Sequence, residues 1–141
     1  MIVVLDTNVV VSGLITPHGP GGDIVRLVSN GDLALCYDAR IIGEYREVLA
    51  RPKFSISRED IVSFLDLIRA TGTVVAASPL PVPLPDPDDD MFLEVALAGM
   101  ADCLVTGNLR DYPVSRRKGM KILSPSEFMR FYRTEQPRQH P

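Results

Sequence analysis

The sequence contains no tryptophan, only two cysteines and no long uninterrupted apolar run. Its longest apolar segments, such as Ile2–Leu5 and Val9–Val11, fall far short of the roughly 20 residues that a membrane-spanning helix needs. Cys36 and Cys103 both lie in apolar segments, so we expect them to be buried and unpaired. We therefore expect neither a membrane span nor a disulfide framework.

Neither sign of charge dominates, since 18 acidic and 15 basic residues give a net charge of −3. The two parts of the chain nevertheless differ: residues 1–109 carry −8 and residues 110–141 carry +5. A chain of this length with 45% apolar residues can bury one core. We expect a single domain over residues 1–134 and a frayed tail at 135–141. Because no basic leader precedes the first acid, we expect a cytoplasmic protein.

Apolar periodicity predicts that strands and helices alternate along the chain. Prolines at every second position from 79 to 87 indicate an extended connector inside the domain, and residues 6–8 and 13–22 are expected to be loops. This alternation predicts an α/β fold with a mostly parallel central sheet of four to five strands and helices on both faces. The predicted strands are 2–5, 33–37, 73–77, 103–106 and 121–123, and the predicted helices are 23–30, 39–51, 58–70, 89–100 and 125–133.

Oxygen-bearing side chains follow several of the predicted strands. Functional groups of open parallel sheets gather outside the carboxyl ends of the strands, so we expect these side chains to converge. Clustered carboxylates repel one another, and a divalent cation relieves that repulsion. A set of oxygen ligands without paired histidine or cysteine fits Mg²⁺ or Mn²⁺, which can support hydrolysis at phosphorus. The candidates are Asp6, Glu44, Asp90, Asn108 and Asp111.

Two of these candidates have close competitors in the sequence. Asp88 and Asp89 directly precede Asp90, and one of these acids is expected to cap the following helix. Glu44 competes with Glu47, one turn further along the same predicted helix. Helical periodicity places both glutamates near the boundary of the buried face, so it does not choose between them.

Other charged residues also have two interpretations. Asp111 is either a ligand or a solvated loop acid, and Glu94 is expected on a solvated helix face. A basic cluster after the fourth strand either contacts RNA phosphates or is a solvated surface, and no aromatic platform for stacking bases accompanies it. This cluster consists of Arg110, Arg116, Arg117 and Lys118.

Three segments in a fixed order carry a family resemblance. They are Val-Leu-Asp-Thr-Asn at 4–8, the segment 41–54 around Glu44, and the segment 86–108, with 16 residues from Asp90 to Thr106. In these segments the sequence resembles the PIN-domain ribonucleases, particularly the VapC-like toxins of prokaryotic toxin–antitoxin pairs. The resemblance implies a PIN-like α/β/α fold and a Mg²⁺- or Mn²⁺-dependent endoribonuclease.

The resemblance also implies roles for individual residues and partners. Asp6, Glu44 and Asp90 correspond to the core acids, and Thr7 and Asn8 support the first of them. Many members have a fourth acid where this chain has Asn108, and Asp111 is a possible substitute. The family further implies a homodimer and an antitoxin that blocks the acidic groove.

Two other functions are consistent with parts of the pattern. A PIN-fold binding module without catalysis would explain the neutral Asn108. A phosphoacceptor signalling domain would also have an acidic Mg²⁺ pocket, but it requires adjacent acids after the first strand and an acceptor aspartate after the third. Here one acid, Asp6, follows the first strand and the proline connector follows the third. The sequence therefore favours the toxin-type endoribonuclease.

Overall fold

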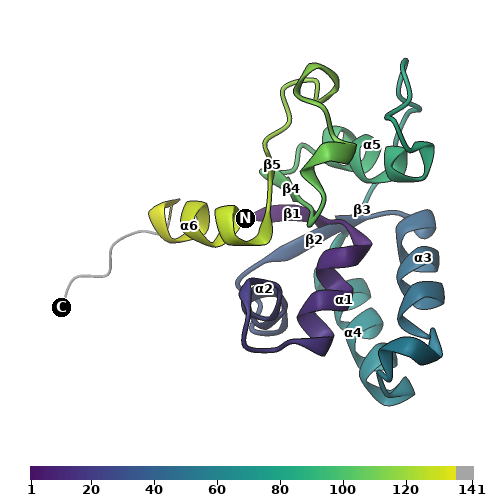
Figure 1. Ribbon diagram of the computed structural model, residues 1–141, viewed down its shortest axis with the longest axis vertical. Coiled ribbons are helices and arrows are strands. Elements are labelled where there is room, and N and C mark those ends of the chain that lie inside the picture. The colour runs from purple at the N-terminus through teal and green to yellow at the C-terminus, as the bar shows by residue number, and fades with distance from the viewer. Residues whose placement is uncertain (136–141) are drawn as a thin grey trace.

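The structure, a computed structural model, describes residues 1–135, in which strands and helices alternate (Figure 1). Short 3₁₀ turns lie between them, including those at Pro87–Asp89 and Leu109–Asp111. No helix in this part of the chain is both long enough and apolar enough to cross a bilayer. The strands are β1 (Ile2–Leu5), β2 (Ala34–Tyr37), β3 (Thr73–Val74), β4 (Cys103–Val105) and β5 (Ile122–Leu123). The helices are α1 (Thr7–Ile15), α2 (Pro20–Ser29), α3 (Ala39–Leu49), α4 (Arg58–Thr71), α5 (Asp90–Ala98) and α6 (Pro125–Glu135).

The five strands form one parallel sheet in the order β3-β2-β1-β4-β5. The chain moves outward from β1 through β2 to β3, then returns to place β4 on the other side of β1. This reversal opens a crevice at the carboxyl ends of β1 and β4, the usual location of functional groups in such sheets. The predicted α/β class and parallel sheet are confirmed.

Helices cover both faces of the sheet. In Figure 1, α5 lies above the strands, while α1, α2 and α4 lie below them. The central strands are therefore buried on both sides, and Val4 and Leu104 are fully inaccessible to solvent. Double burial explains why these strands are apolar throughout rather than alternating. Cys36 and Cys103 are buried and free, as predicted.

Helix α1 was not predicted, because the sequence favours a loop at residues 6–8 and irregular chain at 13–22. That prediction is wrong for a physical reason. The β-branched valines of α1 have low helix propensity, but Val9 is buried and α1 packs closely on α2. A Cβ on Gly13 would come within 2.6 Å of the Gly21 carbonyl oxygen. Glycines that suggest a loop in the sequence thus permit two helices to touch.

The other predicted helices are present with shifted ends. Helix α2 begins at Pro20 rather than residue 23, because proline suits the first turn of a helix. Strand β3 ends at Val74, and residues 75–86, which include most of the proline connector, form neither helix nor strand. Of the tail expected to fray, Glu135 ends α6 and residues 136–141 lie outside the described residues.

Candidate functional site

Asp6 is the most buried carboxylate at the carboxyl edge of the sheet. It follows β1 directly, and only 5% of its surface is exposed. Its Oδ2 accepts hydrogen bonds from the Thr106 hydroxyl at 2.9 Å and the Tyr112 hydroxyl at 3.0 Å. Burial raises the pKa of Asp6 above its ordinary value, although these hydrogen bonds act in the opposite direction. A desolvated carboxyl in a crevice is typical of a functional site.

Glu44 approaches this carboxylate from α3. The hydroxyl of Thr7, the residue after Asp6, donates a hydrogen bond to Glu44 Oε2. Burial raises the pKa of Glu44, and the negative charge of Asp6 raises it further. Glu47 instead forms an exposed ion pair with Arg51 at 2.9 Å. The structure therefore brings Glu44, and not Glu47, to the Asp6 crevice.

Within the acidic segment 86–90, Asp89 is the residue that interacts with Asp6. Burial, followed by the charges of Asp6 and Asp111, raises the pKa of Asp89 to about 8. Asp90 lies differently, because its Oδ1 accepts a hydrogen bond from the backbone N–H of Leu84 at 2.8 Å. The proline connector thus occupies one oxygen of Asp90, and the structure brings Asp89 to the other acids.

The loop after β4 supplies the remaining polar groups. The Asn108 side-chain amide donates to Asp111 Oδ2 at 2.8 Å, and its backbone N–H donates to the Thr106 hydroxyl at 3.0 Å. Asn8 Oδ1 accepts a hydrogen bond from the Gly107 N–H at 2.9 Å, which ties this loop to the start of α1. Asn108 therefore orients Asp111, the acid that the sequence offered as its substitute.

Tyr112 is the site residue that sequence reasoning missed. It is fully buried, and burial together with the nearby charge of Asp6 raises its pKa well above the ordinary value. Nothing in its spacing distinguishes it from a core tyrosine. The hydroxyls of Thr106 and Tyr112 donate to Asp6, and backbone hydrogen bonds from Thr7 and Asn8, which the resemblance names as supporting residues, also act to lower the pKa of Asp6.

Glu94 does not face solvent as expected. Only 7% of its surface is exposed, because the proline connector and Arg40 lie against it. Its carboxylate forms an ion pair with Arg40 at 2.7 Å and accepts a hydrogen bond from the Leu80 N–H at 3.0 Å. The interpretation of Glu94 as a solvated helix residue is therefore wrong.

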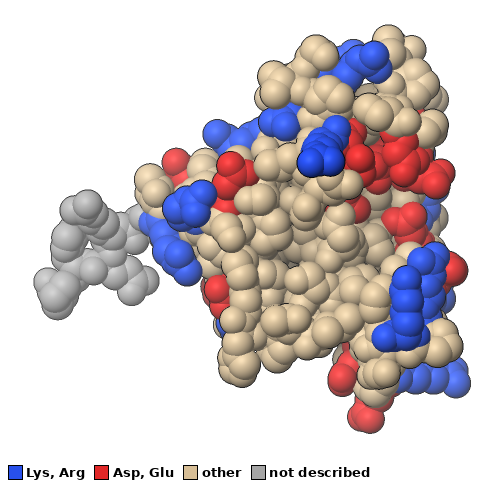
Figure 2. Space-filling model, viewed as in Figure 1, with Lys and Arg blue, Asp and Glu red and all other residues tan. Residues whose placement is uncertain are grey.

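The basic cluster divides into two pairs. Arg116 and Arg117 each donate to a backbone carbonyl, at 2.7 and 2.8 Å. Arg110 and Lys118 are exposed and form no hydrogen bond or ion pair with any side chain or backbone group of residues 1–135. These two cations are therefore available to a ligand. Figure 2 shows acidic side chains gathered over the start of α5 and over the part of α3 that lies nearest to it, with basic side chains beside them.

The donor set of the site fits a hard divalent cation. The described residues contain no group of three or more carboxylate, imidazole or thiolate side chains already arranged around one point. Mg²⁺ does not require such a cage, because one or two carboxylates with water complete its shell. Asp89 Oδ2 is buried and accepts no hydrogen bond from residues 1–135, which leaves a carboxylate oxygen free for a cation. The neighbouring carboxylates supply the negative charge that such an ion neutralises.

Comparisons with known proteins identify the family and the fold. Residues 2–110 match the PIN domain family model. A comparison with curated protein sequences finds no match. VapBC2 from Rickettsia felis, solved bound to a DNA fragment from its promoter, contains a chain with the same fold: the TM-score is 0.56 at 19% identity, covering 88% of this chain and 98% of that one. PIN domains are in general nucleases that use divalent metal ions. Because the family match spans most of the sequence, this chain belongs to the PIN-domain family.

Proposed function

We propose that this protein is a metal-dependent endoribonuclease that hydrolyses RNA phosphodiester bonds. The main supporting observation is the convergence of a buried Asp6 with Asp89 and Asp111 at the crevice between β1 and β4. Glu44 faces the same carboxylates from α3. Four segments bring these acids together, and no cationic side chain of residues 1–135 forms an ion pair with any of the four. A divalent ion stabilises such an arrangement.

Each residue of the site has a distinct role in this proposal. Asp6 and Asp89 hold the cation, and Asp111 and Glu44 complete its surroundings directly or through water. Bound Mg²⁺ or Mn²⁺ supplies a water of lowered pKa and stabilises charge on the phosphoryl oxygens. Thr106 and Tyr112 fix the Asp6 carboxylate by donating to its Oδ2.

Arg110 and Lys118 are proposed to contact the RNA backbone. An acidic crevice repels phosphates, so a nuclease of this type needs cations beside the metal centre. Both side chains lie in the loop that follows β4, the loop that also carries Asp111, and neither is occupied by another residue of the described chain.

Cleavage of a labelled RNA by the purified protein tests the proposal directly. We expect cleavage with Mn²⁺ or Mg²⁺, none with EDTA, and a loss of about 100-fold or more in D6N, as for other groups that stabilise charge in the transition state. D66N is the matched control, because Asp66 is an exposed acid on α4. Equal rates for wild type and D6N would show that the catalytic site lies elsewhere.

We also propose that the protein is the toxin of a toxin–antitoxin pair and a homodimer. The structural similarity to a chain of VapBC2 supports this role. Expression of the chain should arrest bacterial growth, and expression of a small protein encoded beside its gene should relieve the arrest. Light scattering of the purified chain tests the dimer. Tight binding of that small protein without any RNA cleavage would instead favour the inert binding module, for which the neutral Asn108 is the motivating residue.

A further inference from the structure

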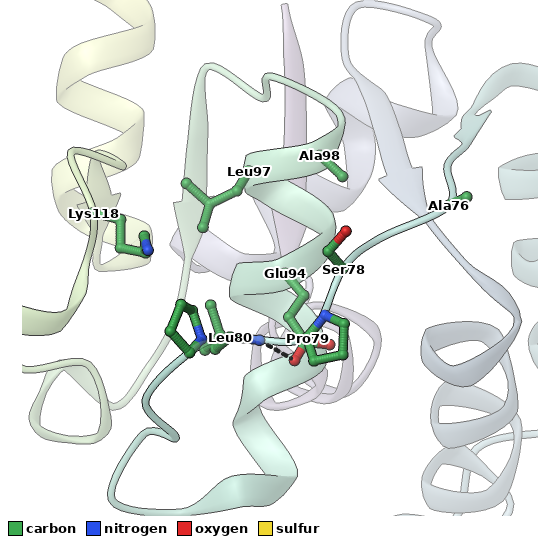
Figure 3. A pocket seen from close by; sticks show the side chains of 9 residues that line it. Ala76, Ser78, Pro79, Leu80, Glu94, Leu97, Ala98 and Lys118 are labelled. Atoms are coloured by element: carbon green, nitrogen blue, oxygen red, sulfur yellow. Dashed lines mark hydrogen bonds between the residues drawn. The ribbon is translucent and has the colours of Figure 1, made fainter.

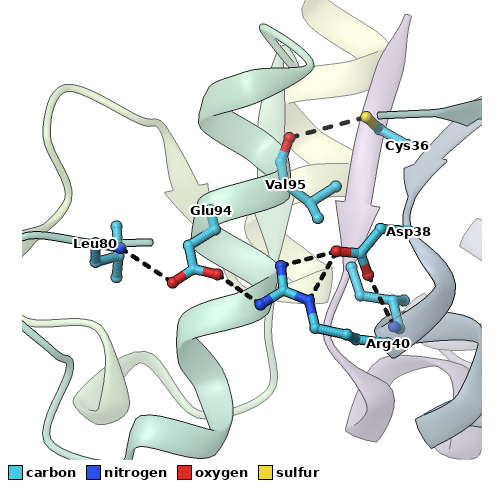
Figure 4. A network of polar contacts seen from close by, with 7 residues as sticks. Cys36, Asp38, Arg40, Leu80, Glu94 and Val95 are labelled. Carbon is cyan, nitrogen blue, oxygen red and sulfur yellow. Dashed lines mark hydrogen bonds and ion pairs between the residues drawn. The ribbon is translucent and has the colours of Figure 1, made fainter. Parts of the chain in front are cut away.

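A network of ionic contacts joins α3, α5 and the end of β2 beside the acidic site (Figure 4). Arg40, in the first turn of α3, directs Nη1 to Glu94 Oε1 on α5 at 2.7 Å. Its Nε and Nη2 contact Asp38 Oδ2, at 2.8 and 2.7 Å. One guanidinium therefore bridges two carboxylates that belong to different elements. We call Asp38, Arg40 and Glu94 the clamp.

The clamp also holds the proline connector. The second oxygen of Glu94 accepts the hydrogen bond from the Leu80 N–H, and a hollow of about 400 Å³ lies between this part of the connector and α5 (Figure 3). Both oxygens of Glu94 are thus engaged, while the carboxylate itself is buried. Breaking one partner of such a pair leaves a buried charge without compensation. This arrangement fixes the position of α5 against α3.

The two helices joined by the clamp carry proposed metal-site acids. On α3, Glu44 lies one turn beyond Arg40, so the two side chains share a face of the helix. On the other side, Asp89 immediately precedes α5, the helix that carries Glu94. Arg40 and Glu44 also line the same hollow of about 340 Å³, together with Asp88 and Met91.

We propose that Arg40 is a positioning residue that sets the distance between Glu44 and Asp89 and so tunes cation binding at the site. This inference rests on the proposed function for its catalytic consequence but not for its effect on metal affinity. The chemistry requires arginine, because its planar fork reaches two carboxylates at once, whereas the single ammonium of lysine does not. Residues that orient metal ligands typically change affinity or activity about 10- to 100-fold when replaced.

The test compares R40K and R40Q with R51Q. Arg51 is the matched control, since it forms an exposed ion pair with Glu47 on the same helix and does not reach α5. Mn²⁺ titration by calorimetry should show Kd raised about tenfold in both Arg40 variants. RNA cleavage should show kcat lowered by about the same factor with KM within twofold, while R51Q matches wild type in both measurements. Circular dichroism identifies a temperature at which each variant is folded.

Further variants separate positioning from simple stabilisation. If R40Q does not fold, R40K carries the test, because it keeps a positive charge opposite Glu94. The R40Q/E94Q double variant should weaken Mn²⁺ binding by less than the sum of the R40Q and E94Q effects, since the two residues share the contact between α3 and α5. Arg40 variants that lose thermal stability but keep wild-type Mn²⁺ affinity would overturn the inference. Mn²⁺ binding by a wild type that cleaves no RNA would contradict the proposed function and leave the Arg40 comparison decisive.

Discussion

At the scale of single residues, the site is organised around carboxylates whose negative charges repel one another. Asp6 is held by two hydroxyl donors and stays close to Asp89, whose pKa rises to about 8. Without a cation, protonation of Asp89 relieves this repulsion. A bound divalent ion removes that requirement, so cation binding at neutral pH releases a proton.

The metal-free protein should therefore lose stability as pH rises. The pKa of Asp89 is raised above its ordinary value of 3.8 to about 8 in the folded state. The folded state thus binds more protons than the unfolded state between these values, and the free energy of unfolding decreases across that window. In EDTA, D89N should be more stable than wild type at pH 8, on the order of 1–2 kcal/mol, because water partly screens this carboxyl.

Urea denaturation at pH 4 and pH 8 measures this effect. The advantage of D89N should disappear at pH 4, where the Asp89 carboxyl is protonated in the folded state. D66N, which replaces an exposed acid on α4, is the matched control. A D89N advantage that is the same at both pH values would contradict the assignment of the raised pKa to Asp89.

The structure favours Asp89 as the third acid of the site, whereas the family resemblance favours Asp90. Substitution of each residue decides between them. D89N should lower kcat about 100-fold or more, because Asp89 interacts with Asp6. D90N should retain most activity, since an asparagine oxygen can still accept the Leu84 N–H bond. Steady-state RNA cleavage under saturating Mn²⁺ measures both. The reverse order of effects would return the ligand role to Asp90.

At the scale of elements, α4 has a start that the sequence signals locally and could be predicted, whereas α1 is held by packing and could not. Ser57 at the start of α4 accepts the Asp60 N–H, and the cap pattern is visible in the sequence. Helix α1 has no side-chain cap at its start, and its valines favour strand. Its helical state depends on contacts with α2 that local sequence does not reveal. Local signals therefore predicted the end of the chain better than its beginning.

The capping box of α6 permits an element-scale prediction. The Ser124 hydroxyl accepts the Glu127 N–H at 3.2 Å, and Glu127 Oε1 accepts the Ser124 N–H at 2.8 Å. This backbone hydrogen bond holds the pKa of Glu127 below its ordinary value. Removing either side chain should destabilise the protein by about 1 kcal/mol at pH 7.

The loss of stability on removing Glu127 depends on pH with a defined sign. A carboxyl with a lowered folded-state pKa stabilises the protein above its unfolded-state pKa, and the contribution vanishes as pH falls through the folded value. The difference in free energy of unfolding between wild type and E127A should therefore be smaller at pH 3 than at pH 7. The corresponding difference for S124A should decrease less. Chemical denaturation of both variants at the two pH values measures this. A pH-independent E127A effect would show that the charge of Glu127 contributes nothing.

At the scale of the whole molecule, topology could be predicted more fully than the identity of the site residues. Alternating strands and helices placed Asp6, Asn108 and Asp111 at one edge of the sheet, and the structure brings them there. The sequence could not choose among adjacent aspartates, because a shift of one residue at a helix start turns the side chain by about 100°. Nor could it find Tyr112, whose role depends on a loop that folds back on β1.

Charge at this scale is unevenly distributed along the chain, and RNA binding should reflect the difference. Residues 110–141 carry +5, and two of their cations, Arg110 and Lys118, have no partner in the described part of the chain. Each phosphate contact to single-stranded RNA contributes a slope of about −0.7 to log K against log salt concentration. R110Q and K118Q should each reduce the measured slope by roughly that amount and weaken binding uniformly across RNA sequences.

Fluorescence anisotropy of labelled RNA in Ca²⁺ or EDTA, at several salt concentrations, measures this slope without cleavage. R133Q serves as the control, because Arg133 is an exposed cation near the end of α6, away from the crevice. Its slope should equal that of wild type. If all three substitutions reduce the slope equally, the positive charge acts through the net charge of residues 110–141 rather than through direct contacts of Arg110 and Lys118. If R110Q and K118Q alone change the slope, these two cations contact RNA phosphates directly.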